Sequence, residues 1–169
     1  MKSIEIYSVL YSLLSTRRVV LLKEIAGERY LPIWIGTNEA DAISRSLQGK
    51  PFARPLTHDL FATVVIELGA EIKHVLISEL RDGTFYAQLA LEKDGQLNVL
   101  DARPSDAIAL AVRMSTPIFA EENVLEQAGI IPTPDIRPDQ SQSTAEAWND
   151  QLNVFRDFVD TLDLDDLGD

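Results

Sequence analysis

Three short segments of this chain carry side chains that bind anions or move protons, each where a helical apolar pattern begins. They read Asn-Glu-Ala-Asp-Ala-Ile at 38–43, Arg-Pro-Leu-Thr-His-Asp-Leu at 54–60 and Arg-Pro-Ser-Asp-Ala-Ile at 103–108. Backbone N–H groups without partners collect at the start of a helix and attract negative charge. If the fold brings the three helix starts together, they form one polar site that accepts an anion.

Several carboxylates accompany these segments, and they suit hard cations such as Mg²⁺ or Mn²⁺ if they converge. The metal ligands that we predict are Asp41, Asp59, Asp101 and Asp106. Helix capping is the simpler interpretation of the same residues. On that interpretation Asn38 caps its helix with Asp41 at the capping-box position, and Asp106 faces the positive end of its own helix and bonds to the N-cap amide.

Two arginines and one histidine are harder to explain by capping. Arg54 and Arg103 each precede a proline, which favours extended backbone and can aim a guanidinium at a phosphate or carboxylate. The alternative is an internal salt bridge to Asp101 or Asp106. His58 lies just inside a helix start, where it can act as a general acid or base, bind a metal, or only cap the helix at the surface.

Several enzyme classes lose support because their motifs are missing. The sequence has no nucleophile elbow, Walker loop, dinucleotide glycine fingerprint or His-Glu-x-x-His zinc pair. It contains no cysteine, which removes disulfides and thiolate sites and favours a reducing cytoplasm. No signal peptide is visible, and no apolar run reaches the roughly 20 residues of a membrane span. We therefore expect a soluble cytoplasmic protein without a membrane partner.

The net charge of −12 is unevenly distributed. Residues 135–169 hold ten acidic residues and two arginines, a net charge of −8, whereas residues 1–134 carry only −4. Affinity for nucleic acid comes largely from Lys and Arg that neutralise phosphates, so extensive duplex contact is disfavoured. A local basic patch stays open as an alternative to scattered surface charge; its members would be Arg45, Lys50, Arg54, Arg103 and Arg113.

The hydrophobic pattern predicts a domain built of both strands and helices. We expect strands at 4–11, 19–22, 30–35, 72–80, 84–92 and 97–100, with helices after 38, 57, 104 and 120. Thr57 is the expected N-cap of the second helix. The helix face that should turn to the core consists of Leu60, Phe61, Val64, Val65 and Leu68. Segments 24–43 and 92–108 share one order of parts, which suggests a duplicated strand-strand-helix unit.

The C-terminal part differs in composition from the rest. Residues 132–143 are rich in Pro, Asp, Gln and Ser, as linkers are. Residues 144–169 predict an acidic amphipathic helix and tail, with an apolar stripe formed by Trp148, Leu152, Phe155, Val159 and Leu162. This stripe either docks on its own domain or a sister subunit, or recruits a separate partner.

The three segments, together with Leu-Pro-Ile-Trp-Ile-Gly at 31–36, resemble the bifunctional nuclease domain family over roughly residues 1–131. The resemblance implies a compact, internally duplicated α+β domain with a mixed sheet. It also implies self-association, most simply as a dimer, and nuclease activity on DNA and RNA. The positions that match are Glu39, Arg54, Thr57, His58, Asp59, Asp101, Arg103, Ser105 and Asp106. The acidic C-terminal segment lies outside the match.

Combining residues and resemblance gives a nuclease hypothesis for short or single-stranded nucleic acid. The catalytic residues would be His58, Asp59, Asp106 and Glu39, and the substrate-binding residues Arg54, Arg103, Thr57 and Ser105. Mg²⁺ or Mn²⁺ would assist. The alternative is a non-catalytic regulatory or assembly module that holds a nucleotide or another anion at the same helix starts.

Overall fold

The computed structural model of the protein describes residues 1–11, 18–49 and 53–131. The chain divides into two compact units, Met1–Ile130 and Ile131–Asp169. The predicted linker at 132–143 and the predicted helix at 144–169 lie outside the described residues.

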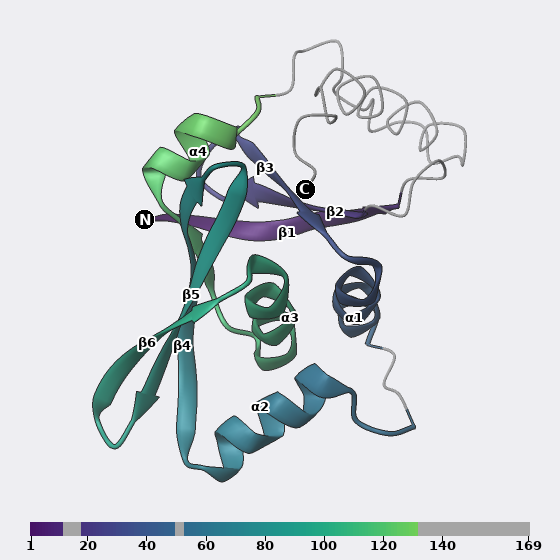
Figure 1. Cartoon of the computed structure of the whole chain (residues 1–169), viewed down its shortest axis with the longest axis vertical. Coiled ribbons are helices and arrows are strands. Elements are labelled where there is room, and N and C mark those ends of the chain that lie inside the picture. Colours follow the sequence, from purple (N-terminus) through teal and green to yellow (C-terminus); the bar gives the residue numbers. More distant parts are fainter. Residues whose placement is uncertain (12–17, 50–52, 132–169) are drawn as a thin grey trace. The chain divides into compact units, whose positions relative to one another are not determined.

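A curled sheet with seven strands forms the body of this unit (Figure 1). Its strands are β1 (Lys2–Tyr11), β2 (Arg18–Glu24), β3 (Tyr30–Ile35), β4 (Ala70–Arg81), β5 (Thr84–Lys93), β6 (Gln96–Ala102) and β7 (Ile118–Ala120). The strand order is β3-β2-β1-β7-β4-β5-β6. The helices are α1 (Thr37–Leu47), α2 (Thr57–Glu67), α3 (Pro104–Met114) and α4 (Glu122–Ala128). The predicted α+β class and mixed sheet are confirmed.

The sheet consists of two similar halves around β7. In each half three consecutive antiparallel strands lead into a helix, β1-β2-β3-α1 in the first and β4-β5-β6-α3 in the second. The central β7 pairs antiparallel with β1 and parallel with β4. Register shifts interrupt β1 and β4, the first strand of each half, and such bulges bend a strand and increase its twist. The duplicated unit therefore contains one more strand than the sequence indicated.

Asp-Gly pairs produce the two tight turns of the second half. Asp82 and Gly83 join β4 to β5, and Asp94 and Gly95 join β5 to β6. All four residues have positive φ, between 50° and 74°, which the twist of a hairpin with a two-residue turn requires. Glycine reaches this region without steric cost, and aspartate is among the residues that tolerate it best. These turns were predicted and are confirmed.

The core lies between the sheet and helices α1 and α3. Alternate residues of the strands point inward, such as Leu31 and Ile33 in β3, and are almost fully buried. Helix α3 packs against α1, α2, β4 and β5, so it is buried on nearly all sides (Figure 1). Its run from Ala107 to Ala111 is mostly alanine, and small side chains let its neighbours approach closely.

Four expectations about this unit are wrong in detail. Helix α1 has Gly36 as its N-cap, so Asn38 lies inside the helix, and α2 begins after Leu56, so Thr57 is its first residue. Strand β7 was missed because three residues carry too little pattern. In α2 only Ala62 and Val65 are buried. Of the face predicted to be buried, Val65 is buried as expected, whereas the other members are exposed: Leu60, Phe61, Val64 and Leu68. Within the described residues no helix is long and apolar enough to cross a membrane.

Candidate active site

A cleft of about 1040 Å³ opens where the starts of α1, α2 and α3 meet strands β5 and β6. All three polar segments line it: Glu39 and Asp41 from α1, His58 from α2, and Arg103 and Asp106 from the start of α3. Because α3 packs against both α1 and α2, the three helix starts surround one opening. The structure thus brings together segments whose convergence the sequence left open.

Each of these helices has an acidic side chain at its third residue: Glu39 in α1, Asp59 in α2 and Asp106 in α3. Acids are favoured there because they complement the unpaired N–H groups and the positive end of the helix dipole. The carboxylates of Glu39 and Asp106 share Arg103, whereas that of Asp59 binds Arg113. The group of Glu39, Asp106 and Arg103 therefore faces the cleft, and the pair of Asp59 and Arg113 supports it.

Arg103 joins α1 to α3 across the cleft. Its Nε donates to Asp106 Oδ2 at 2.8 Å, and its Nη2 donates to Glu39 Oε1 at 2.9 Å and to Asp106 Oδ1 at 3.2 Å. Glu39 can fold back in this way because Gly36 leaves room where a Cβ would meet its carboxylate. The Arg103 side chain is still 67% exposed, so its guanidinium is accessible to an incoming anion.

His58 is oriented by the carboxylate of Asp106, with Nε2 and Oδ1 3.0 Å apart. Burial by itself would raise the pKa of Asp106, but hydrogen bonds from Arg103 and His58 and their charges outweigh burial and lower the pKa. Asp106 is therefore ionised at neutral pH and can only accept, so Nε2 of His58 carries the proton. In the neutral ring Nδ1 is then the basic nitrogen, which is the arrangement that a general base needs.

Beneath the cleft, Arg113 ties the three helices together. Its Nε donates to Asp59 Oδ1, its Nη1 donates to the carbonyl of Ala109 at 2.8 Å, and its Nη2 donates to the carbonyl of Ala42 at 3.3 Å. The second oxygen of Asp59 accepts the amide of Leu56 at 2.8 Å. Burial would raise the pKa of Asp59, but these two donors lower it. Asp59 thereby fixes the start of α2 and the position of the neighbouring His58.

A sequence profile of the bifunctional nuclease domain matches residues 20–133. The chain belongs to the bifunctional nuclease domain family. An uncharacterized protein of Mycobacterium tuberculosis is 43% identical over 150 residues, which cover 88% of this chain and 87% of that protein. The match therefore continues beyond the domain itself in that relative.

Plant relatives carry the name of the activity. Bifunctional nuclease 2 of Oryza sativa subsp. japonica is 30% identical over 115 residues, which cover 66% of this chain but 35% of the rice protein. Bifunctional nuclease 1 of Arabidopsis thaliana is 30% identical over 103 residues, which cover 59% of this chain and 32% of the plant protein. The chain thus spans about a third of each plant protein.

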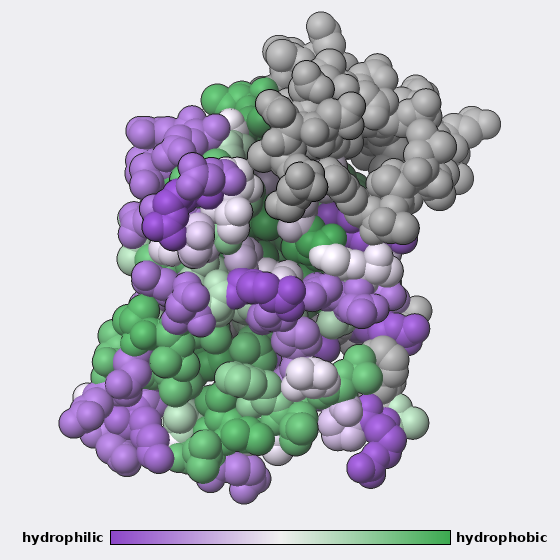
Figure 2. All heavy atoms as spheres, viewed as in Figure 1, coloured by the Kyte–Doolittle hydropathy of each residue, from purple (hydrophilic) through white to green (hydrophobic). Residues whose placement is uncertain are grey.

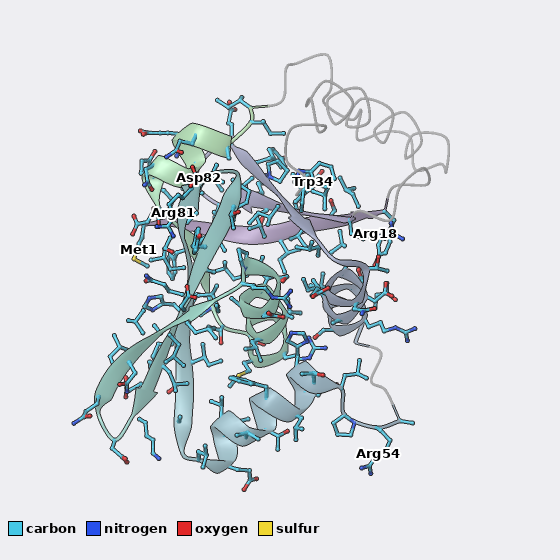
Figure 3. All side chains as sticks on the ribbon, in the orientation of Figure 1. Met1, Arg18, Trp34, Arg54, Arg81 and Asp82 are labelled. Carbon is cyan, nitrogen blue, oxygen red and sulfur yellow. The ribbon has the colours of Figure 1, made fainter. Side chains whose placement is uncertain are left out.

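Within this bifunctional nuclease domain the predicted substrate-binding residues have different positions. Thr57 lines the cleft beside His58. Ser105 is only 7% exposed and is not part of the cleft lining. Arg54 is exposed, and its side chain points away from α1 and α3 (Figure 3). Of the suggested basic patch, Arg45 and Arg103 line the cleft, and Lys50 lies outside the described residues.

The predicted metal ligands also separate. Asp41, Asp101 and Asp106 line the cleft, whereas Asp59 is held by Arg113 and the amide of Leu56. Among residues 1–11, 18–49 and 53–131, no three His, Asp or Glu side chains are grouped closely enough to hold a metal ion. The metal-binding roles stay predictions.

Sequence reasoning missed the apolar wall of the cleft, formed by Leu56, Phe61, Leu89, Leu100 and Leu110. Phe61 had been assigned to the core because it fits the apolar stripe of α2. A signal was present, because Phe61 follows His58 by three residues and must share its side of the helix.

Proposed function

We propose that this protein hydrolyses phosphodiester bonds of DNA and RNA in the cleft. The observation that carries the proposal is a histidine oriented by an ionised carboxylate beside an exposed guanidinium: His58, Asp106 and Arg103. Membership of the bifunctional nuclease domain family and the names of the plant relatives support it. Family membership alone does not say which side chains react with the substrate. The arrangement of His58, Asp106 and Arg103 in the cleft suggests these side chains.

In this proposal His58 is the general base. Its Nδ1 takes a proton from a water molecule, the water oxygen bonds to phosphorus, and the ester bond to the leaving oxygen breaks. That oxygen takes a proton from solvent. Arg103 donates hydrogen bonds to the non-bridging oxygens, where charge develops. Glu39 and Asp106 hold the guanidinium in place, and Thr57 can hydrogen-bond the bound phosphate.

The charge of the cleft restricts the substrate. Four acids, Glu39, Asp41, Asp101 and Asp106, line it against two arginines, Arg45 and Arg103. A phosphate polymer that ran through such a site would meet more repulsion than attraction. We therefore propose short or single-stranded nucleic acid, which places few phosphates in the cleft.

We propose that Mg²⁺ or Mn²⁺ enters together with the substrate. Mg²⁺ usually binds through one or two carboxylates plus phosphate oxygens and water, so it needs no complete protein cage. Asp41 and Asp101 are the cleft carboxylates that lack an ion pair within the described residues, and they are the proposed ligands. The ion would offset the negative charge around a bound phosphate.

The test is cleavage of end-labelled single-stranded DNA and RNA by the full chain with Mg²⁺, with Mn²⁺ and with a chelator. We expect His58→Ala to lose roughly 10²- to 10⁴-fold of the rate, the usual contribution of a general base. His74→Ala is the matched control, because His74 lies in β4 against Phe119 and not in the cleft. No cleavage by the purified wild type would refute the nuclease and leave the anion-binding module.

We also propose that the chain forms a dimer in the cytoplasm. The absence of cysteine supports a reducing compartment. Exposed apolar side chains support self-association, namely Leu60, Val64 and Ile66 of α2, Leu68 just after it, and Leu97 and Val99 of β6. Figure 2 shows hydrophobic atoms gathered over this part of the surface. Large exposed apolar patches commonly mark interaction sites.

A further inference from the structure

One wall of the cleft is apolar and faces solvent. Leu56 just before α2, Phe61 of α2 and Leu100 of β6 line the cleft and are 37%, 45% and 42% exposed. Behind them Leu89 and Leu110 are 5% and 3% exposed and form a closed apolar floor. The cleft is therefore lined both by an aromatic ring with aliphatic side chains and by the His58, Asp106 and Arg103 group.

A ligand that is only a phosphate does not explain why apolar and charged side chains line the same cleft. An inorganic anion or a sugar phosphate would gain nothing from the phenyl ring and the leucines. A nucleobase has an apolar face that stacks on aromatic side chains and a polar edge, and it is joined to a phosphate by a sugar. The volume of about 1040 Å³ is at the upper end of the range for small-ligand sites and leaves room for more than one nucleotide unit.

The spacing on α2 matches a ligand with a base and a phosphate. His58 and Phe61 are three residues apart in the helix, so they share one side of it and are separated by roughly 4.5 Å along its axis. A base stacked on Phe61 would direct its attached sugar phosphate along the helix toward His58. Arg103 stands next to that position through its contact with Asp106.

We propose that the Phe61, Leu56 and Leu100 wall is a nucleobase subsite, so that the cleft takes a nucleotide whose base is unpaired and unstacked. This inference rests on the proposed function and gives a reason for a single-stranded substrate, since the bases of a duplex are held in the stack. Specificity for one base is not part of the proposal, because every base presents an aromatic face.

The experiment compares two probes on the full chain by calorimetry: adenosine monophosphate, and ribose 5-phosphate, which lacks the base. We expect the nucleotide to bind roughly 5- to 100-fold more tightly, which is the range for stacking of one base. Phe61→Ala should abolish most of this difference and leave the affinity for ribose 5-phosphate unchanged. Tyr7→Ala is the control, because Tyr7 is a half-exposed aromatic residue outside the cleft.

A second comparison needs no variant. Single-stranded DNA with one abasic position should bind less tightly than the intact strand when that position occupies the cleft. Equal affinity for nucleotide and ribose 5-phosphate, or no binding of either, would overturn the inference. Tighter binding of ligands that carry a base, without cleavage, would support the subsite and refute the nuclease. Cleavage that is unaffected by the abasic position and by Phe61→Ala would support the nuclease and refute the subsite.

Discussion

Replacing Arg113 tests how the cleft is held together. The Arg113 side chain is 9% exposed and bonds to Asp59 of α2, to the carbonyl of Ala42 in α1 and to α3 itself. In Arg113→Met the apolar stem stays and these donors disappear. The change should destabilise the first unit and release the start of α2, because the partly buried carboxylate of Asp59 then loses its cation.

The size of the expected destabilisation depends on what still stabilises the Asp59 carboxylate once Arg113 is replaced. Breaking a buried ion pair from one side costs about 3–5 kcal/mol, because a charge is left without compensation. The Asp59 side chain is 34% exposed, so water replaces part of what the guanidinium supplied. We therefore expect the free energy of unfolding to fall by about 2–3 kcal/mol.

Urea unfolding followed by circular dichroism measures this loss. Asp59→Asn and the double variant complete a cycle, for which we expect a coupling energy of about 1–2 kcal/mol. Arg81→Met is the control, since Arg81 lies at the exposed end of β4 over the ring of Tyr86 and should cause a much smaller change (Figure 3). A loss below about 0.5 kcal/mol in Arg113→Met, the range of surface substitutions, would refute the supporting role.

Two further outcomes can be measured on the same protein. The pKa of Asp59 and of Asp106 is lower in the folded chain than the usual 3.8. The ionised carboxylates therefore stabilise the folded state at neutral pH, and this contribution is lost as the pH falls through 3.8 and below. The melting temperature should therefore drop in that pH range at constant ionic strength, and it should drop less steeply in Asp59→Asn than in the wild type. The same slope of melting temperature against pH in both proteins would contradict this. If the exposed face of α2 forms the dimer, Leu60→Glu should give a monomer by light scattering, whereas Ile25→Glu, also 58% exposed but in the β2–β3 turn, should not.

Much of the fold was predictable because its signals are local. Asp82-Gly83 and Asp94-Gly95 specify tight turns by their tolerance of positive φ, and the flanking strands alternate between apolar and polar residues. The exposure of α2 was not predictable from its own sequence. Its apolar stripe fits a buried helix, and only the arrangement of the sheet shows that α2 contacts little besides α3 and β4.

The types of residue in the site were predictable, and so was one contact, the salt bridge between Arg103 and Asp106. The other partners were not. Proline at 104 placed Asp106 in the first turn of α3, as observed. Capping then predicted a bond from Asp106 to its own N-cap amide, whereas its carboxylate accepts from the side chains of Arg103 and His58. His58 is 48 residues away along the chain, and a contact over that distance depends on how the helices pack.

The duplication explains why one arginine can hold two helices. Glu39 and Asp106 are the third residues of α1 and α3, the helices that end the two similar halves, and both carboxylates bond to Arg103. The repeated Asp-Ala-Ile triplets are not equivalent in this sense, since Asp41 lies two positions deeper in its helix than Asp106. What the triplets share is orientation: Ile43 and Ile108 are fully buried while their aspartates line the cleft. A helix start with a buried isoleucine two residues after an acid that lines the cleft therefore appears twice. The start of α2, which the duplication does not supply, adds His58.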